Sequence, residues 1–464
     1  MRDLKELTGY DIITEEKIPE VNGTGYILSH KKTKARVLVI ANDDENKVFN
    51  IGFRTPPYDD SGIPHILEHS VLCGSRKYPV KDPFVELAKG SLNTFLNAMT
   101  YSDKTVYPVA SCNEKDFENL MDVYLDAVFY PNIYEHTEIM RQEGWHYELE
   151  TVEGELSYNG VVFNEMKGAF SSPEQQMYSK IEKLLLADTP YKNESGGDPA
   201  AIPTLSQERF LDFHRKYYHP SNSYIYLYGD LDMYKELDYI DKEYLSSFDH
   251  REIDSTIAVQ TAYEQMKDES CFYSIAENES EENQTFLTYN MVVGSSLDKK
   301  QSVAMNILEY AIMDAPGAPL KKALVDAGIG EDVFASFDDG IRQTIFSIVA
   351  RNANMSDKER FVSVIRDTLT DLSGHGEEGK AIDRTSIEAA INNFEFKHKE
   401  ANFGRFPKGL MMGLDAFNTW LYDDASALEM FKLNEVYDEL KESLKTGYFE
   451  ELIRKYLLDN PFEA

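Results

Sequence analysis

The hydrophobic pattern of the first half of the chain alternates between strand-like and helix-like segments. Runs of β-branched and aromatic residues at 35–40 and 48–53 flank the turn-like residues 42–44 and predict two strands. A helix is expected to open near residues 61–64, because Pro64 suits the first turn of a helix. The remaining pattern predicts strands at 97–111 and 223–228, and helices at 113–129, 134–144, 161–170, 174–186 and 205–217.

A polar stretch without helical periodicity, residues 248–269, indicates a connection between two domains. The second half then repeats the order of the first. Its pattern predicts strands at 271–275, 285–293, 333–337 and 341–350, helices at 358–372 and 386–399, and a mostly helical end at 410–458. Two sequential α+β domains, residues 1–250 and 251–464, fit this order better than one alternating βα array.

The motif His65-Ile66-Leu67-Glu68-His69 carries the clearest chemical signal. On a helix, His65 and His69 are one turn apart and point the same way, which is the spacing needed to clamp one metal ion. Imidazole pairs suit Zn²⁺, and Glu68 beside the second histidine can act as the base that activates a metal-bound water. The alternative is a chance match in which both histidines are ordinary surface groups.

A third zinc ligand is expected from a second helix, and Glu165 is the best candidate. It shares a helical face with Val161, Gly168 and Ala169, whose small or compact side chains would let another helix approach closely. Taken alone, Glu165 would be interpreted as an exposed helix residue. It becomes a candidate zinc ligand only because the motif at residues 65–69 is also present. A structural zinc site is disfavoured, because such sites have four protein ligands and are usually rich in cysteine.

The charge balance narrows the class of partner. The sequence has 47 Lys and Arg against 81 Asp and Glu, a net charge of −34. Such a field repels nucleic acid and anionic membrane surfaces, and it favours either basic peptides or simple solubility.

Cysteine usage and apolar segments point to a cytoplasmic protein. Cys73, Cys112 and Cys271 are far apart in the sequence, which argues for a reducing compartment. No apolar run approaches the roughly 20 residues that span a bilayer. Residues 1–6 contain no apolar stretch typical of a secretory signal and are too acidic for a typical transit peptide.

Several stretches resemble the presequence protease branch of the pitrilysin/insulin-degrading-enzyme (insulinase) metallopeptidases. They are residues 61–75, 89–98, 100–105 and 160–168, with a weaker match at 316–324. The resemblance implies two pitrilysin-type domains, each an antiparallel-rich sheet packed by helices, of which the second is non-catalytic. It also implies a zinc endopeptidase that degrades short unstructured peptides, with Asn97, Ala98 and Met99 on an edge strand that pairs with substrate backbone.

Members of this branch are longer than the present chain, and their two halves close like a clamshell. The second half supplies an Arg and a Tyr that polarise the scissile carbonyl, and nothing here maps to them. We therefore expect this chain to correspond to an N-terminal half, with a missing C-terminal half or a homologous subunit as its partner. The alternative is a non-catalytic peptide-binding or assembly subunit, although the presence of His65, Glu68, His69 and Glu165 together argues against it.

Overall fold

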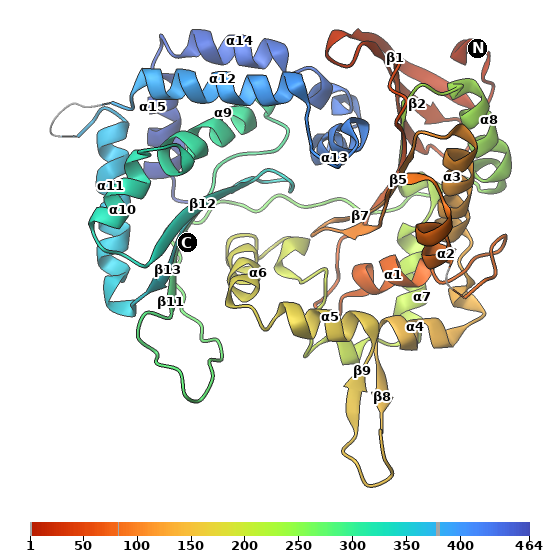
Figure 1. Cartoon of the computed structure of the whole chain (residues 1–464), viewed down its shortest axis with the longest axis horizontal. Coiled ribbons are helices and arrows are strands. Elements are labelled where there is room, and N and C mark those ends of the chain that lie inside the picture. Colours follow the sequence, from red (N-terminus) through yellow and green to blue (C-terminus); the bar gives the residue numbers. More distant parts are fainter. Residues whose placement is uncertain (1, 82, 377–380) are drawn as a thin grey trace. The chain divides into compact units, whose positions relative to one another are not determined.

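The computed structural model describes residues 2–81, 83–376 and 381–464, which fall into two compact units. Unit 1 comprises Met1–Gln175, Thr189–Ala258 and Phe403–Phe431, and unit 2 comprises Gln176–Asp188, Val259–Asn402 and Lys432–Ala464 (Figure 1). The chain passes from unit 1 to unit 2 at residues 258 and 259, inside the predicted connection. Two shorter segments depart from a strictly sequential division. Residues 176–188 come from the first half of the chain but belong to unit 2, and residues 403–431 come from the second half but belong to unit 1.

Unit 1 is built on a mainly antiparallel sheet in the order β1-β2-β3-β10-β4-β7-β5, with the short β6 also paired to β7. Only β10 and β3 run parallel among these strand pairs. The predicted strand at 97–111 is interrupted, because a turn at 101–103 separates β6 from β7. The strands are β1 (Tyr10–Ile18), β2 (Gly23–His30), β3 (Arg36–Ala41), β4 (Lys47–Arg54), β5 (Asn93–Leu96), β6 (Met99–Thr100), β7 (Lys104–Ser111) and β10 (Ser223–Gly229).

Helices cover both faces of this sheet. One face packs on helices that follow in the first half of the sequence, namely α1 (Ile63–Val71), α3 (Glu114–Phe129) and α7 (Gln207–Tyr217). The other face packs on α13 (Lys408–Trp420), which comes from the last quarter of the chain. Strand β10 shows the alternation: Ile225 and Leu227 face the first layer, whereas Tyr224, Tyr226 and Tyr228 face α13.

Two glycines let α13 lie directly on the tyrosine rings of β10. A Cβ placed at Gly413 would come 2.3 Å from the Tyr226 ring, and one at Gly409 would come 2.1 Å from the Tyr228 ring. Any larger residue would push the helix off the sheet. The sequence pattern predicts helix in this region but not that the helix belongs to unit 1.

The predicted helices of unit 1 begin and end within a few residues of the observed ones, whereas the helices at 83–90 and 233–243 were not predicted. Side chains of Asn113, Ser206 and Asp232 cap the first turns of three helices of this unit, as expected for N-cap residues. The remaining elements are α2 (Pro83–Gly90), α4 (Thr137–Glu143), α5 (Val161–Ala169), α8 (Met233–Glu243), the hairpin β8 (His146–Glu148) and β9 (Ser157–Asn159), and α6 (Pro173–Leu185), which runs on into unit 2.

Unit 2 holds a smaller antiparallel sheet in the order β11-β13-β12, made of β11 (Thr285–Val292), β12 (Asp332–Asp338) and β13 (Ile345–Ala353). The strand predicted at 271–275 is wrong, because this segment is irregular and lies largely exposed, with no neighbouring strand to complete its hydrogen bonds. The α+β class is confirmed. The helices are α9 (Lys299–Glu309), α10 (Pro319–Asp326), α11 (Lys358–Leu372), α12 (Arg384–Glu400), α14 (Asn434–Ser443) and α15 (Tyr448–Leu452).

Within the described ranges, every helix is too short or too polar to cross a lipid bilayer.

Candidate metal centre

Helix α1 presents the two histidines of the motif on one face and buries the other. It starts after Gly62, whose φ of +69° suits a residue without a side chain, and Pro64 occupies its first turn. Ile66 and Leu67 are fully buried in the core of unit 1 and fix the rotation of the helix. The rings of His65 and His69 lie 5.0 Å apart, with side chains 12% and 25% exposed.

Glu165 of α5 completes a group of three metal-ligating side chains. Its Oε2 lies 3.8 Å from Nε2 of His65 and 3.8 Å from Nε2 of His69. Ligand atoms at about 2 Å from a tetrahedral zinc ion lie about 3.3 Å from one another, so a small inward movement of the half-exposed Glu165 would close the set. Two imidazoles and one carboxylate fit a zinc ion with its fourth position open.

The second ring nitrogen of each histidine faces a fixed acceptor. His65 Nδ1 lies 3.0 Å from the backbone carbonyl of Gly196, and His69 Nδ1 lies 3.5 Å from the carboxylate of Glu143 at the end of α4. With the protons on Nδ1, both Nε2 atoms keep a free lone pair directed toward Glu165. The sequence analysis missed Gly196 and Glu143, which lie 131 and 74 residues from their histidine partners.

Charges around His69 alter its protonation. Burial alone would lower the pKa of His69, but the neighbouring carboxylates of Glu143, Glu68 and Glu165 more than offset this and raise it. Burial would likewise raise the pKa of Glu143, but its contacts with His69 and Gln142 hold that pKa below the ordinary value. Glu143 is therefore ionised at neutral pH and supplies a negative charge next to the imidazole.

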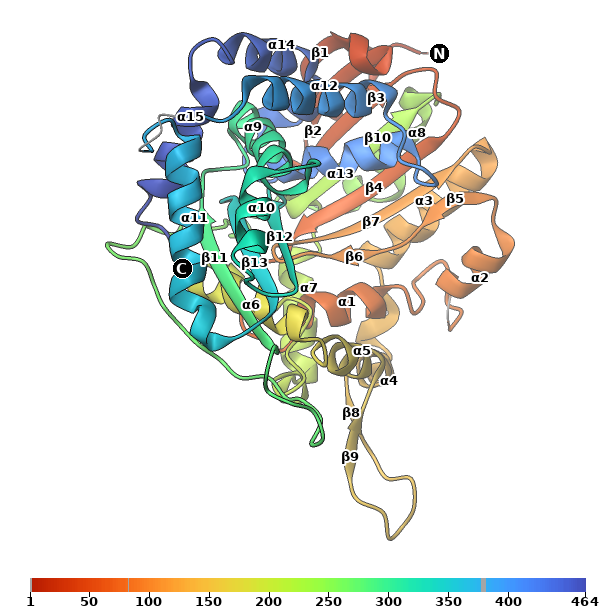
Figure 2. The ribbon, with the colours of Figure 1, turned by 60° about the vertical axis from the view of Figure 1, so that its left-hand side comes forward.

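Helix α4 packs against both α1 and α5 and so helps to hold Glu165 at its distance from the histidines (Figures 1 and 2). A Cβ at Gly144 would come 3.1 Å from Ile66 of α1, and one at Gly160 would come 2.2 Å from the Gly144 carbonyl. Close packing at these two glycines thus sets the spacing of the three helices. The expectation that Gly168 permits close approach is wrong, because, in the part of the chain that the structure describes, no heavy atom of another element lies within 4 Å of a Cβ placed there.

Glu68 lies on α1 next to His69 in the sequence, and its side chain is buried. Burial is the main cause that raises the phenol pKa of Tyr101, Tyr107 and Tyr124, and the negative charge of Glu68 adds to it in each case. The three phenols therefore remain neutral at physiological pH.

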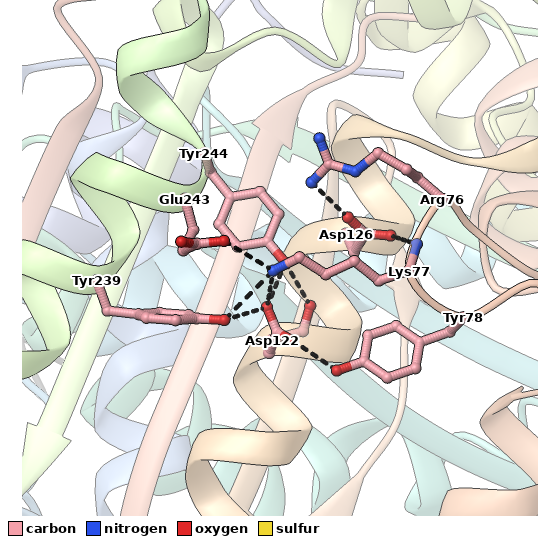
Figure 3. A network of polar contacts seen from close by, with 8 residues as sticks. All are labelled: Arg76, Lys77, Tyr78, Asp122, Asp126, Tyr239, Glu243 and Tyr244. Carbon is pink, nitrogen blue, oxygen red and sulfur yellow. Dashed lines mark hydrogen bonds and ion pairs between the residues drawn. The ribbon is translucent and has the colours of Figure 1, made fainter.

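A polar network anchors the segment that follows α1 (Figure 3). Asp122 of α3 accepts hydrogen bonds from the phenols of Tyr78, Tyr239 and Tyr244 and from the Lys77 ammonium. Burial would raise the pKa of Asp122, but these donors outweigh it and lower the pKa. One turn further along α3, Asp126 binds the Arg76 guanidinium and the Lys77 backbone N–H. The chain leaving α1 is thereby tied to α3 and α8.

Asn97 and Ala98 lie between β5 and β6, and Met99 begins β6, at the end of the sheet order beyond β7. The Asn97 N–H donates to the Pro108 carbonyl at 3.3 Å, and the Tyr124 hydroxyl donates to the Asn97 carbonyl at 3.2 Å. Met99 pairs with Val106 inside β6. Within the described ranges, the backbone N–H and C=O of Ala98 make no hydrogen bond. Ala98 as a whole is 7% exposed, so its unpartnered backbone groups lie in a largely buried residue at this edge.

Comparison with known families matches two models of the M16 peptidases. Residues 48–179 match "Insulinase (Peptidase family M16)" and residues 204–394 match "Peptidase M16 inactive domain". The chain is 51% identical over 453 residues to protein HypA of Clostridium perfringens, which covers 98% of the chain and 46% of that protein. It is 42% identical over 467 residues to presequence protease 1 of Arabidopsis thaliana, covering 99% and 43%. The chain thus spans less than half the length of these relatives.

Solved structures show the same fold at low identity. A protease from Helicobacter pylori aligns with a TM-score of 0.67 and 15% identity, covering 95% of this chain and 98% of that one. Pitrilysin aligns with a TM-score of 0.61 and 17% identity, covering 96% of this chain and 46% of pitrilysin. The helix that carries His65 and His69 lies inside the insulinase match, and the predicted resemblance is confirmed. The chain belongs to the M16 peptidase family and is similar to its presequence protease branch.

Proposed function

We propose that this chain is the metal-binding half of a zinc endopeptidase that cleaves short unstructured peptides. The observation that carries the proposal is the convergence of His65, His69 and Glu165, with Glu68 on the same helix as the histidines. Two imidazoles and one carboxylate with an open fourth position are typical of catalytic rather than structural zinc sites.

Each residue then has a defined role. His65, His69 and Glu165 would hold the ion, which supplies Lewis-acid polarisation of the peptide carbonyl and activation of water. Glu68 would accept the proton of the attacking water and pass it to the leaving amine. Glu68 is buried, which limits its contact with bulk water and strengthens electrostatic interactions at its carboxylate.

Asn97, Ala98 and Met99 are proposed to bind the substrate backbone. The free N–H and C=O of Ala98 can pair with an extended peptide, which recognises main chain without requiring a particular side-chain sequence. Such binding suits a peptidase for varied, unfolded substrates. The net charge of −34 further suggests a preference for basic peptides. Equal cleavage rates for matched acidic and basic peptides at low salt would contradict that preference.

A partner is part of the proposal. The relatives are more than twice as long as the matched region, so we propose that a C-terminal half or a homologous subunit completes the enzyme and supplies transition-state stabilising groups.

Because Cys73, Cys112 and Cys271 form no disulfide, we also propose a reducing, cytoplasmic environment.

The second candidate function is a non-catalytic, peptide-binding or assembly subunit. The match of residues 204–394 to an inactive M16 domain favours it for that part of the chain. The intact group of His65, Glu68, His69 and Glu165 in unit 1 favours the peptidase, because a chain without catalysis has no need of all four.

Metal content and peptide cleavage together test the proposal. We expect bound zinc in the wild type and in Glu68→Gln, and cleavage of an internally quenched unstructured peptide about 10²–10⁴-fold slower in the variant, because only the proton transfer is lost. Zinc in both proteins without cleavage in either would favour the second candidate or the need for a partner half. Absence of zinc from both would overturn the proposed function.

A further inference from the structure

We propose that Glu143 is a positioning residue of the metal centre: it fixes the ring of His69 and thereby sets the affinity for the metal ion. This inference rests on the proposed function, since it assumes that His69 is a ligand. It adds a residue that lies outside the His-x-x-Glu-His motif and on a different helix from all the proposed ligands.

The contacts of Glu143 direct its carboxylate toward His69. Oε2 lies 3.5 Å from Nδ1 of His69, and Oε1 accepts a hydrogen bond from Gln142 Nε2 at 2.9 Å. The side chain is only 9% exposed, so bulk water does not replace these partners. A buried carboxylate is strongly destabilised unless it is paired, and the His69 ring is its partner here.

The backbone beneath Glu143 is also fixed. Met140, one turn earlier on α4, is buried, and the N–H of Gly144 closes the helix on the Met140 carbonyl at 2.8 Å. Gly144 packs against Ile66 of α1, so the end of α4 and the metal-binding helix share one contact. The carboxylate therefore has little freedom to leave the imidazole.

The two histidines differ in the acceptor that orients them. His65 faces the neutral carbonyl of Gly196, whereas His69 faces an ionised carboxylate. A carboxylate acceptor increases the electron density at the distal nitrogen more than a carbonyl does, so it strengthens the bond from Nε2 to a metal. Loss of the Glu143 charge should weaken metal binding through His69 even though Glu143 itself does not touch the ion.

The experiment compares metal affinity in Glu143→Gln and in the matched control Glu138→Gln. Glu138 lies on the same helix, is 73% exposed and pairs with His136 at the surface. We expect Glu143→Gln to bind Zn²⁺ about 10–100-fold more weakly in a chelator competition, and Glu138→Gln to bind like the wild type. The visible spectrum of the Co²⁺-substituted proteins gives a second readout, because a reoriented His69 changes the ligand field and a purely structural change elsewhere does not.

The outcomes separate this inference from the proposed function. If the wild type binds neither Zn²⁺ nor Co²⁺, the proposed function fails. If the wild type binds both, and Glu143→Gln has the same affinity and the same Co²⁺ spectrum, the positioning role fails while the proposed function stands. Should Glu143→Gln not fold, Glu143→Asp keeps the charge but withdraws it by one methylene. An intermediate loss of affinity in that variant supports the role, and wild-type affinity overturns it.

Discussion

Two helices at corresponding places in the two units, α1 and α9, differ in what their polar side chains do. Each follows the sheet strand before it after a short loop: α1 comes after β4, and α9 comes after β11. In α1 the polar residues His65 and His69 face the carboxylate of Glu165 from another helix. In α9 the buried polar residue Gln301 instead donates its side-chain amide to the carbonyl of Val293, at the end of the preceding strand.

The difference teaches that the strand–helix order alone does not create a candidate metal centre. Three side chains must converge, and in unit 1 this depends on α4 and α5, which the chain inserts between β7 and β10. Within the described ranges, the only group of three His, Cys, Asp or Glu side chains close enough to hold a metal is His65, His69 and Glu165. Unit 2 shares the α+β construction but, in the part described, has no such group.

The largest effect is expected from removing a proposed ligand. His69→Ala should lose stoichiometric zinc, because two remaining ligands bind the ion far more weakly than three. His398→Ala, on α12 of unit 2, should keep the zinc content of the wild type. Metal analysis of both purified proteins after dialysis checks the comparison. Loss of zinc from the His398 variant would contradict the assignment of the metal ion to unit 1.

A smaller effect is expected from the helix packed on the far face of the unit 1 sheet. Gly413→Ala forces a methyl group against Tyr226 and should destabilise unit 1 by about 1–3 kcal/mol. Gly168→Ala in α5 meets open space and should stabilise by about 0.5–1 kcal/mol through its helix propensity. Both tryptophans, Trp145 and Trp420, lie in unit 1, so their fluorescence during urea unfolding reports on that unit. Equal midpoints for the two variants would contradict the packing described for α13.

The smallest effect is a pH dependence carried by a buried histidine of unit 1. Burial lowers the pKa of His214 from 6.5 to about 4, and its ring nitrogens contact Tyr134 and the Val128 carbonyl. The unfolded chain therefore binds this proton more readily than the folded one. The contribution of neutral His214 to the free energy of unfolding is fully present above pH 6.5 and is lost progressively as the pH falls toward 4.

Between pH 7.5 and 5.5 the free energy of unfolding should fall by about 1 kcal/mol because of His214. Urea unfolding followed by tryptophan fluorescence at the two pH values measures it. His214→Gln should show a flatter dependence, whereas His136→Gln, at an exposed position, should behave like the wild type. A dependence that persists unchanged in His214→Gln would assign it to other groups.

The sequence by itself determined the parts of the site that are encoded locally. The spacing of His65 and His69 depends only on the helical repeat, so it predicts that the two rings share one face of their helix. Glu165 was a candidate because it lies on a second predicted helix, where the family resemblance covers residues 160–168, and it lies 3.8 Å from both histidines. Most strands and helices followed from their hydrophobic period. The strand predicted at 271–275 does not form, because this segment has no partner strand among the described residues, and β1, α2 and α8 were not predicted.

Only the tertiary structure decided which distant residues support that site. Glu143, Gly196 and Asp122 carry no local signal, because a buried carboxylate or a loop carbonyl resembles any other until its partner is placed beside it. The packing of α13 on the sheet of unit 1 could not be predicted from the sequence either. Periodicity shows that a helix has an apolar face, but not which surface buries that face. Local spacing fixes the direction of side chains, whereas contacts across long sequence separations fix what those side chains meet.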